Sequence, residues 1–365
     1  MMPAPPLAIL GAGLVSGVGL TAEESCAAIR CGINKFDETR FIGSDGNWLV
    51  GSEVGLEEPW RGITKLAKMA ARAIGECLAT AAEQRADAIP VLVCVAEPER
   101  AGRFETLPRV LLGGIEEDLG SRLHPHSRVI EQGRVGGAVA LLQARRMLAQ
   151  GRYPRVIVAG VDSFLVGPTL EAYSRDDRLL TRMNSNGFIP GEAAGAVLLA
   201  VHQKDLPAHL LCRGLGFARE PAPLGTGQAL RAEGLVQAIR AALDEAGLRL
   251  EDCDHRIADV SGEQYRFKEA ALAITRLLRE PKVFFSLWHP ADCIGEVGAA
   301  ALPVMLAVLH AAARKNYLPG PIFVGHLAND DDKRAAFVTQ ATAVQGLALE
   351  SAAERSFGVR RRRML

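Results

Sequence analysis

One sequence pattern occurs twice in this chain and constrains its fold more than any other feature. The first copy begins at Gly133 and reads GRVGGAVALLQARRMLAQGRYPRVIVAG. The second begins at Gly295 and reads GEVGAAALPVMLAVLHAAARKNYLPGPIFVG. Each copy has a glycine-rich start, an apolar helix, a basic turn with Tyr and Pro, and a strand that ends in Gly. This repeat predicts an internal duplication, with the two halves meeting near residue 205.

Strand and helix patterns alternate on both sides of that boundary. Buried-strand patterns cover residues 7–16, 90–96, 129–130, 155–163, 187–200, 210–216, 257–263 and 282–287, and helix patterns cover 63–82, 229–246 and 264–279. Alternation of this kind predicts an α/β fold in which mainly parallel sheets lie between helix layers. We divide the chain into an N-terminal half at 1–205, a C-terminal half at 206–350, and a basic tail at 351–365. The tail, with Arg360 to Arg363, is expected to be a solvated end.

Composition limits the classes of partner. The chain has 42 Lys and Arg against 42 Asp and Glu, so its formal net charge is zero. A neutral chain is a poor match for nucleic acid or an acidic membrane surface. The seven cysteines are scattered without a CxxC pair, which indicates a reducing compartment. The N-terminus lacks a signal-peptide pattern and no apolar run is long enough to span a membrane. We therefore expect a cytoplasmic protein that binds no nucleic acid, membrane, metal or cofactor.

The start of each duplicated helix is a suitable place for a reactive group. Unpaired N–H groups and the helix dipole favour a thiolate or another anion where a helix follows a buried strand. The first such position holds Gly133 and Arg134, and the second holds Gly295 and Glu296. Arginine is permanently charged and cannot attack a carbonyl. The scaffold therefore suits acyl chemistry, but its nucleophile is missing.

Two other segments carry potentially reactive or charged side chains. Cys293 and His289 lie close together in the segment WHPADC, with Asp292 between them. They are candidates for a Cys–His–Asp set, although the members of such sets usually come from separate strands. The acidic run at 328–334 is expected to be a solvated turn because it lacks the spacing of a calcium loop.

Several motifs resemble those of the β-ketoacyl synthase branch of the thiolase fold, over nearly the whole chain. LAILGAGLVSGVGLTAEESCAAIRCG looks like the opening strand and helix of that family, and GEVGAAAL looks like its last active-site helix. NGFIPGEAAGAVLLA is close to the family's G-F-x-x-G-E-x-x-G turn, which would be built by Gly187, Gly191, Glu192 and Gly195. The resemblance implies a five-layered αβαβα fold of two duplicated α/β halves. It also implies a dimer with a continuous central sheet.

The catalytic positions depart from this family. Its members use one Cys and two His residues. The resemblance places the Cys at Gly133 or Arg134, the first His at Ser261 and the second His at Gly295. The glycine-rich C-terminal loop of the family is replaced by VGHLAND. These four differences imply a degenerate member in which the catalytic residues are absent.

The charges at the two helix starts suggest a specific contact. The repeat aligns Arg134 with Glu296, and the two helix starts of this fold converge on the active site. A buried charge without a partner costs several kcal/mol. We therefore hypothesise that Arg134 and Glu296 pair within the former pocket.

Three functions remain open. The first is a non-catalytic protein that binds a partner, scaffolds an assembly or serves as an accessory subunit. Its partner would be a second copy, another thiolase-like subunit, an acyl carrier protein or secreted effector cargo. The second is an acyltransferase or 3-oxoacyl synthase-like enzyme with a changed mechanism that uses Cys293, His289 or Ser261. The third is a subunit similar to a chain-length factor, because Glu131 and Gln132 before glycines resemble the Glu-Gln of those proteins.

Overall fold

The computed structural model describes residues 5–81, 85–203 and 209–342. The predicted basic tail at 351–365 lies outside the described residues, as does the end of the predicted C-terminal half at 343–350. The division of the chain near residue 205 stays a prediction, since residues 204–208 also lie outside the described part.

The first half of the chain supplies five strands of the main sheet and a separate hairpin. Its main strands are β1 (Leu7–Ser16), β4 (Val91–Val95), β5 (Arg128–Glu131), β6 (Val156–Ser163) and β7 (Glu192–Val201), and its hairpin strands are β2 (Asp37–Ile42) and β3 (Trp48–Gly51). Its α-helices are α1 (Ala22–Arg30), α2 (Gly62–Thr80), α3 (Leu107–Leu119), α4 (Gly136–Ala149) and α5 (Gly167–Arg175). A 3₁₀ turn at Gly133–Val135 leads directly into α4.

The second half supplies the other five strands of the main sheet. They are β8 (Leu210–Arg219), β9 (His255–Ala258), β10 (Leu287–Trp288), β11 (Ile322–Ala328) and β12 (Lys333–Ala341). Its α-helices are α6 (Glu233–Ala246), α7 (Gln264–Leu277), the short α8 (Ala291–Ile294) and α9 (Ala301–Arg314). A 3₁₀ turn at Gly298–Ala300 leads into α9, as the equivalent turn leads into α4.

The strand order confirms the predicted duplication. From the centre outward, the first half runs β1, β7, β6, β4, β5 and the second half runs β8, β12, β11, β9, β10. In each half this is the first, fifth, fourth, second and third strand in chain order. The inner pairings of each half are antiparallel and the outer ones are parallel. A short antiparallel pairing of β1 with β8 joins the two halves into one ten-stranded sheet.

The prediction of mainly parallel sheets is wrong. Five of the nine strand pairings in the described sheet are antiparallel. Helical crossovers make the outer strands parallel, because a crossover returns the chain to the same end of the sheet. The last strand of each half, β7 or β12, instead begins at the end of the sheet where the preceding strand stops. It therefore runs antiparallel to that strand. In the second half, β11 and β12 form a hairpin, and β12 was absent from the prediction.

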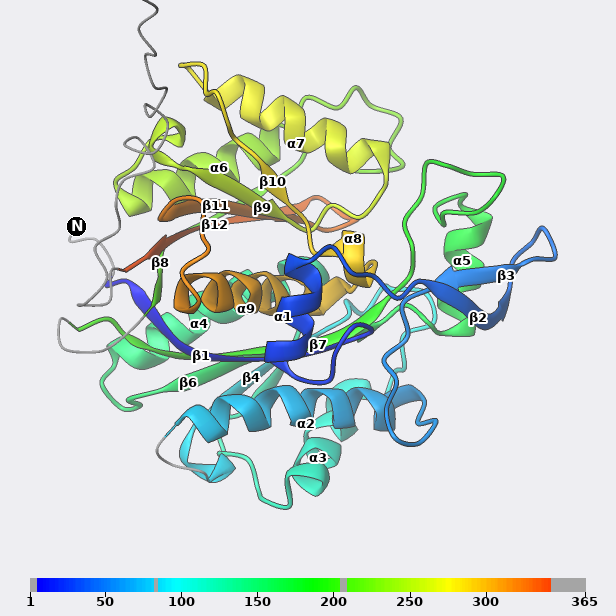
Figure 1. The fold of residues 1–365 in the computed structure, drawn as a ribbon, viewed down its shortest axis with the longest axis horizontal. Helices are drawn as coiled ribbons and strands as arrows, with labels where there is room; N and C mark the ends of the chain where they lie inside the picture. The colour runs from blue at the N-terminus through cyan, green and yellow to red at the C-terminus, as the bar shows by residue number, and fades with distance from the viewer. Residues whose placement is uncertain (1–4, 82–84, 204–208, 343–365) are drawn as a thin grey trace, which may run out of the picture.

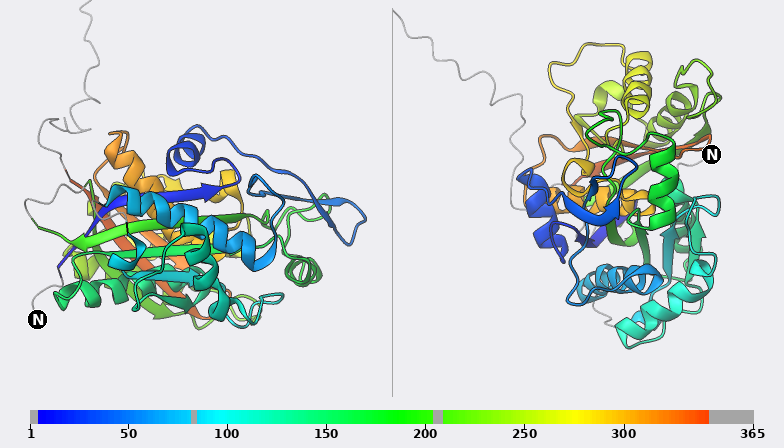
Figure 2. Two further views of the ribbon diagram at one scale, coloured as in Figure 1. Left: turned by 90° about the horizontal axis from the view of Figure 1, so that it is seen from below. Right: turned by 90° about the vertical axis from the view of Figure 1, so that its right-hand side faces the viewer.

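The layers agree with the predicted five-layered αβαβα fold (Figure 1). Helices α4 and α9 form the middle layer, and their apolar residues pack in one core with residues of both sheet halves. Helices α2 and α3 cover the outer face of the first half, and α6 with α7 covers the outer face of the second. Figure 2 shows the same stacking from two further directions. The fold therefore brings the starts of α4 and α9 together at its centre.

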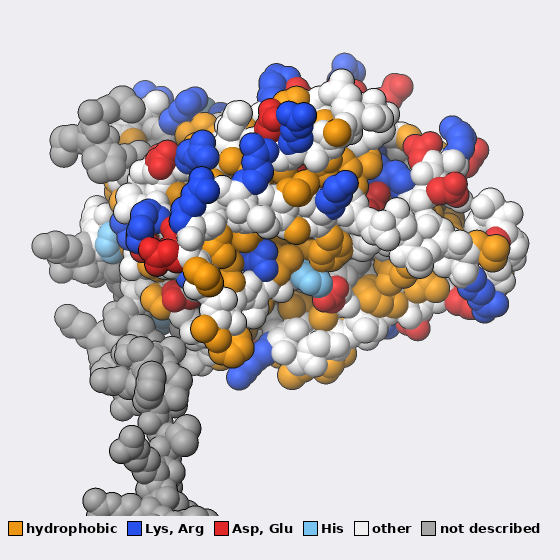
Figure 3. All heavy atoms as spheres, turned by 90° about the horizontal axis from the view of Figure 1, so that it is seen from above, with side chains coloured by type: hydrophobic (Ala, Val, Ile, Leu, Met, Phe, Trp, Pro, Cys, Tyr) orange, Lys and Arg blue, Asp and Glu red, His pale blue; other side chains and the backbone are white. Residues whose placement is uncertain are grey.

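The sheet of the second half differs from the sequence prediction at one strand. A strand was predicted at 282–287, but the structure has only the two-residue β10 at its end. Val283 and Phe284 are 90% and 78% exposed, whereas Phe285 and Leu287 pack against buried clusters of this half. Figure 3 shows the outer face of this half, where Lys and Arg side chains are spread over the surface.

Two general features of the described residues concern the predicted environment. None of the helices in this part of the chain is both long and apolar enough to cross a membrane. All seven cysteines lie within the described residues and are free thiols.

Candidate functional site

The two 3₁₀ turns in the middle of the molecule have nearly the same backbone conformation. Gly133 has a φ of 56° and Gly298 has a φ of 48°, both in the left-handed region that favours glycine. The residues before them, Gln132 and Val297, have φ and ψ of −128° and 15°, and −122° and 14°. The structural repeat therefore aligns Gly133 with Gly298, so the alignment of Gly133 with Gly295 and of Arg134 with Glu296 is wrong by three residues.

Arg134 and Glu296 nevertheless meet between the two helix starts. The Nε atom of Arg134 donates a hydrogen bond of 3.1 Å to Oε1 of Glu296, and Nη2 lies 3.1 Å from Oε2. Their side chains are only 3% and 2% exposed. Glu296 also accepts hydrogen bonds from the Ser261 hydroxyl at 2.7 Å and from the backbone N–H of Gly298 at 2.8 Å. The carboxylate is fully satisfied, as a buried charge requires.

A second carboxylate extends this pair into a network. Asp330 accepts a hydrogen bond of 2.8 Å from Nη1 of Arg134, and it also pairs with Arg178 and Arg266. The Tyr173 hydroxyl donates to the same carboxylate at 3.1 Å. Asp330 comes from the acidic run at 328–334 that was expected to be a solvated turn. For Asp330 that expectation is wrong, because three arginines from other segments hold its carboxylate against the core.

Glu296 and Asp330 are both ionised in this setting. Burial alone would raise the pKa of Glu296, but the Arg134 guanidinium outweighs it and holds the pKa below its usual range. Burial acts on Asp330 in the same direction, and Arg134, Arg266 and Arg178 together hold the pKa of Asp330 well below its usual range. We name the side chains of Arg134, Glu296, Asp330, Arg178 and Arg266 the central ion network.

Carboxylates also lie under both helix starts. A side chain added at Gly133 would collide with the carboxylate of Glu97, and one added at Gly298 would collide with that of Asp162. Asp162 accepts a hydrogen bond of 2.8 Å from the backbone N–H of Ala299. Arg100 joins the two acids, with Nη1 2.7 Å from Asp162 and Nη2 2.9 Å from Glu97. No sequence motif predicted a role for Glu97, Arg100 or Asp162.

The residues that replace the expected catalytic set leave little room for other side chains. Gly295 has a φ of 70°, and a Cβ atom there would lie 2.6 Å from the backbone oxygen of Ile189. A backbone atom of a buried strand turn cannot move aside as a side chain can. Beside Glu296 and Asp259, a cavity of about 20 Å³ remains, room for about one water molecule. The centre of the fold is therefore filled.

Of the alternative reactive residues, Ser261 is bonded to Glu296, whereas Cys293 and His289 have other partners. The Cys293 thiol is 4% exposed, and its sulfur lies 3.9 Å from the backbone oxygen of Ile29. Burial, with a further contribution from Asp292, raises the pKa of Cys293, which disfavours the reactive thiolate. His289 lies 2.9 Å from Asp292. The structure thus brings His289 to Asp292, while among the described residues the thiol of Cys293 contacts the Ile29 carbonyl and not His289.

The predicted scaffold motif surrounds a second buried charge. The carboxylate of Glu192 pairs with Lys65 of α2 and accepts hydrogen bonds from the backbone N–H of Val54 and the hydroxyl of Ser163, both at 2.8 Å. Its glycines allow close approach, since added side chains would collide with Leu179 at Gly187, with Ile294 at Gly191 and with Val304 at Gly195. The motif therefore joins α2, β7 and the start of α9.

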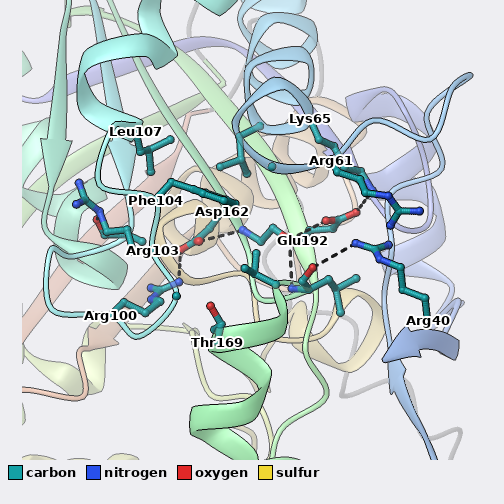
Figure 4. Close-up of a pocket in the computed structure, with 17 residues that line it drawn as sticks. Arg40, Arg61, Lys65, Arg100, Arg103, Phe104, Leu107, Asp162, Thr169 and Glu192 are labelled. Carbon is teal, nitrogen blue, oxygen red and sulfur yellow. Dashed lines mark hydrogen bonds and ion pairs between the residues drawn. The ribbon is translucent and has the colours of Figure 1, made fainter. Parts of the chain in front are cut away.

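Beside this motif lies a small cavity lined by charged side chains (Figure 4). Its volume is about 40 Å³, which suits a few water molecules. The charged residues that line it are Arg40, Arg61, Lys65, Arg100, Arg103, Asp162 and Glu192. Most of these cations have carboxylate partners, including Glu53 for Arg40 and Glu131 for Arg103. Within the described ranges, no three His, Cys, Asp or Glu side chains gather in a way that would hold a metal ion.

Comparison with known proteins shows which fold this is. No protein-family model and no curated protein sequence matches the chain. The ishigamide ketosynthase/chain length factor structure is 17% identical, has a TM-score of 0.75, and covers 93% of this chain and 100% of its own. The AntDE:AntF structure is of a type II PKS acyl-carrier protein in complex with its ketosynthase. It is 14% identical, has a TM-score of 0.76, and covers 93% of this chain and 100% of its own.

A third match is the ketosynthase ApeO in complex with its chain length factor ApeC from Xenorhabdus doucetiae. It is 13% identical, has a TM-score of 0.67, and covers 93% of this chain and 98% of its own. At such identities a match shows the fold alone. The chain therefore has the thiolase-like fold of ketosynthases and chain length factors.

Proposed function

We propose that this chain is a non-catalytic, ketosynthase-like subunit that acts by associating with a second thiolase-fold subunit. The observation that carries the proposal is the central ion network. It occupies the point where the two duplicated helices begin, which is where the resemblance places the nucleophile. Breaking a buried pair by removing one partner typically costs about 3–5 kcal/mol, so the network is expected to keep this position closed.

The remaining nucleophiles support the same interpretation. Attack on a thioester requires an activated thiolate or hydroxyl beside a general base. The Ser261 hydroxyl donates to Glu296, whose charge is already neutralised by Arg134. Cys293 is buried and has a raised pKa. An enzyme with a changed mechanism is therefore the weaker proposal.

The free edge of the sheet is the proposed site of association. Strand β5 ends the ten-strand order, and its pairing partner within the described residues is β4. An unpaired edge offers N–H and C=O groups to another strand. The resemblance implies a dimer with a continuous central sheet, and pairing of β5 with the same edge of a second subunit would produce one.

A chain-length-factor role is the second candidate. Two of the matched structures are of a ketosynthase with a chain length factor. In this chain Gln132 comes directly before Gly133, at the start of the turn that leads into α4. In this role the chain would associate with a catalytic ketosynthase and tune the length of the partner's product.

The test combines a chemical and an association measurement on the full chain. We expect intact-mass analysis after incubation with acyl-carrier thioesters to show no covalent acyl adduct. We expect sedimentation velocity to show a 1:1 complex with a thiolase-fold subunit from the same genome, or a dimer of this chain. Val129→Lys places a charge on β5 and should weaken association at least tenfold, because edge charges oppose strand pairing. Val129 also packs against the core under α2 and α3, so thermal melting checks that the variant is folded.

Phe284→Lys is the matched control, because Phe284 precedes β10 at the opposite end of the sheet order and is 78% exposed. It should leave association unchanged. A stoichiometric adduct on Cys293 or Ser261 would overturn the non-catalytic role. A monomer that binds no thiolase-fold subunit would overturn the role in association.

A further inference from the structure

A cavity of about 410 Å³ lies between α1, α9 and β1, away from the central ion network. Figure 1 shows α1 beside α9 and β1 on the near side of the middle layer. Its volume falls within the range of pockets that hold small molecules, about 300–1,000 Å³. Nothing in the proposed association requires this cavity, because association uses β5 at an edge of the sheet.

The walls of the cavity are mostly small apolar side chains. They come from all three elements and include Leu10, Ala12, Cys26, Ala27, Ala307 and Ala311. Small residues leave the space open, while their methyl groups make it apolar. Burial raises the pKa of Cys26 to about 12, so its thiol adds no charge. A wall of this kind suits an aliphatic chain, which gains free energy by leaving water.

The rim of the cavity is positively charged. Arg30, Arg314 and Lys315 line it, and Glu23 is the single carboxylate among the lining residues. Glu23 pairs with Lys315 at 3.1 Å. The Arg30 guanidinium lies 4.0 Å from the centre of the Tyr317 ring. Within the part of the chain that the structure describes, Arg314 forms no ion pair, so the rim keeps an excess of positive charge.

Two histidine side chains add polar surface to the cavity but no charge. His209 and His310 also line it, with ring centres 6.2 Å apart. Burial lowers the pKa of His310 to about 4, with further lowering from His209 and Arg314. Burial and Arg314 likewise lower the pKa of His209. Both imidazoles are therefore neutral, and the positive charge at the cavity comes from its Arg and Lys side chains.

We propose that this cavity binds a single-chain aliphatic anion of the fatty carboxylate type. The aliphatic chain lies against the alanine walls of α1 and α9. The carboxylate lies at the rim, where Arg314 and Arg30 neutralise it. A cationic or zwitterionic ligand does not fit this charge distribution, and an uncharged alcohol of the same length lacks the interaction with the rim.

The test uses decanoate as the probe and the full chain, with binding measured by isothermal titration calorimetry below the micelle concentration. We expect saturable 1:1 binding of decanoate and about fivefold weaker binding of decanol, the gain from one exposed charge interaction. Arg314→Gln should weaken decanoate binding about fivefold and leave decanol binding unchanged. Ala27→Phe places a ring in the cavity from an exposed position and should abolish binding of both.

Arg240→Gln, on the outer helix α6, is the matched control and should bind decanoate as the wild-type chain does. Thermal melting of each variant checks that it is folded. The proposal is overturned if decanoate does not bind, if decanol binds as tightly as decanoate, or if Arg314→Gln and Ala27→Phe bind both ligands normally.

Discussion

At the scale of single residues, the chain closes its centre with charges rather than with a larger apolar core. Arg134, Arg266 and Arg334 are all at most 3% exposed, and each has a carboxylate partner. The sequence predicted that Arg134 and Glu296 would meet, because both stand at the start of a repeated motif. It did not predict Asp330, Arg178 or Arg266, which come from turns and a helix far apart along the chain. Only the three-dimensional fold brings them together.

Removing the charge of Glu296 tests the energy of this network. Glu296→Gln keeps the shape, but one of the two carboxylate oxygens becomes an NH₂ group that cannot accept hydrogen bonds. Arg134 then keeps only one of its two carboxylate partners, Asp330. We expect the free energy of unfolding to fall by about 3 kcal/mol, measured by urea denaturation. Glu171→Gln breaks an exposed pair with Arg175 and should change it by less than about 0.5 kcal/mol.

Asp259 makes stability depend on pH in a defined window. Its side chain is buried beside the network, and Oδ2 accepts a hydrogen bond of 2.9 Å from the backbone N–H of Ala328. Burial raises the pKa of Asp259 to about 6, despite the opposing effects of Arg266 and Arg134. In the unfolded chain, the pKa of this side chain should be about 3.9. Between about pH 4 and 6 the folded state binds more protons, so this group reduces stability as the pH rises.

Asp259→Asn removes that titration. We expect the variant to be more stable than the wild-type chain at pH 7.5, by up to about 3 kcal/mol, since two pKa units correspond to that energy. The difference should shrink as the pH falls and vanish below about pH 4. Urea denaturation across this range measures it. A variant that is equally destabilised at every pH would show that the Asn side chain is simply a poor fit.

At the scale of elements, hydrophobic periodicity predicted the long helices closely. The helix predicted at 63–82 is observed at Gly62–Thr80, and the one predicted at 264–279 is observed at Gln264–Leu277. Strand direction could not be predicted in the same way, because it depends on which end of the sheet each connection returns to. The predicted strand at 282–287 is apolar enough for a core, yet no helix covers Val283 or Phe284.

Glycines in the central strands set the distance between sheet and outer helix in both halves. A Cβ atom at Gly13 of β1 would collide with the backbone oxygen of Ala73 in α2, and one at Gly216 of β8 would collide with that of Ala238 in α6. We expect Gly13→Ala and Gly216→Ala each to lower the free energy of unfolding by about 2–3 kcal/mol, measured by denaturation, because the helix must move away. At Gly113 in α3, an added Cβ atom would meet open space, so Gly113→Ala should raise the free energy of unfolding by up to about 1 kcal/mol. Unchanged stability in the first two variants would mean that these helices shift freely.

At the scale of the whole molecule, the sequence predicted the duplicated five-layered fold because scaffold motifs persist along the entire chain. The site was less predictable. The repeat copies are similar in composition, so an alignment shifted by three residues was indistinguishable until the φ values of Gly133 and Gly298 fixed it. Glu97, Arg100 and Asp162 carried no motif, yet they support both helix starts.

Because the centre of the fold is closed, we expect that introducing one Cys and two His residues there will not create an active site. In the triple variant Gly133→Cys, Ser261→His and Gly295→His, the new side chain at 295 collides with the Ile189 backbone and the one at 133 with Glu97. Ser261→His also removes a hydrogen bond to Glu296. We expect a less stable protein that forms no acyl adduct with carrier thioesters by intact-mass analysis. The single variant Gly133→Cys controls for reactivity of an isolated thiol. The ion network and the fixed backbone should keep thioesters out of the central site. Stoichiometric acylation of the triple variant, but not of Gly133→Cys, would show instead that this site still opens.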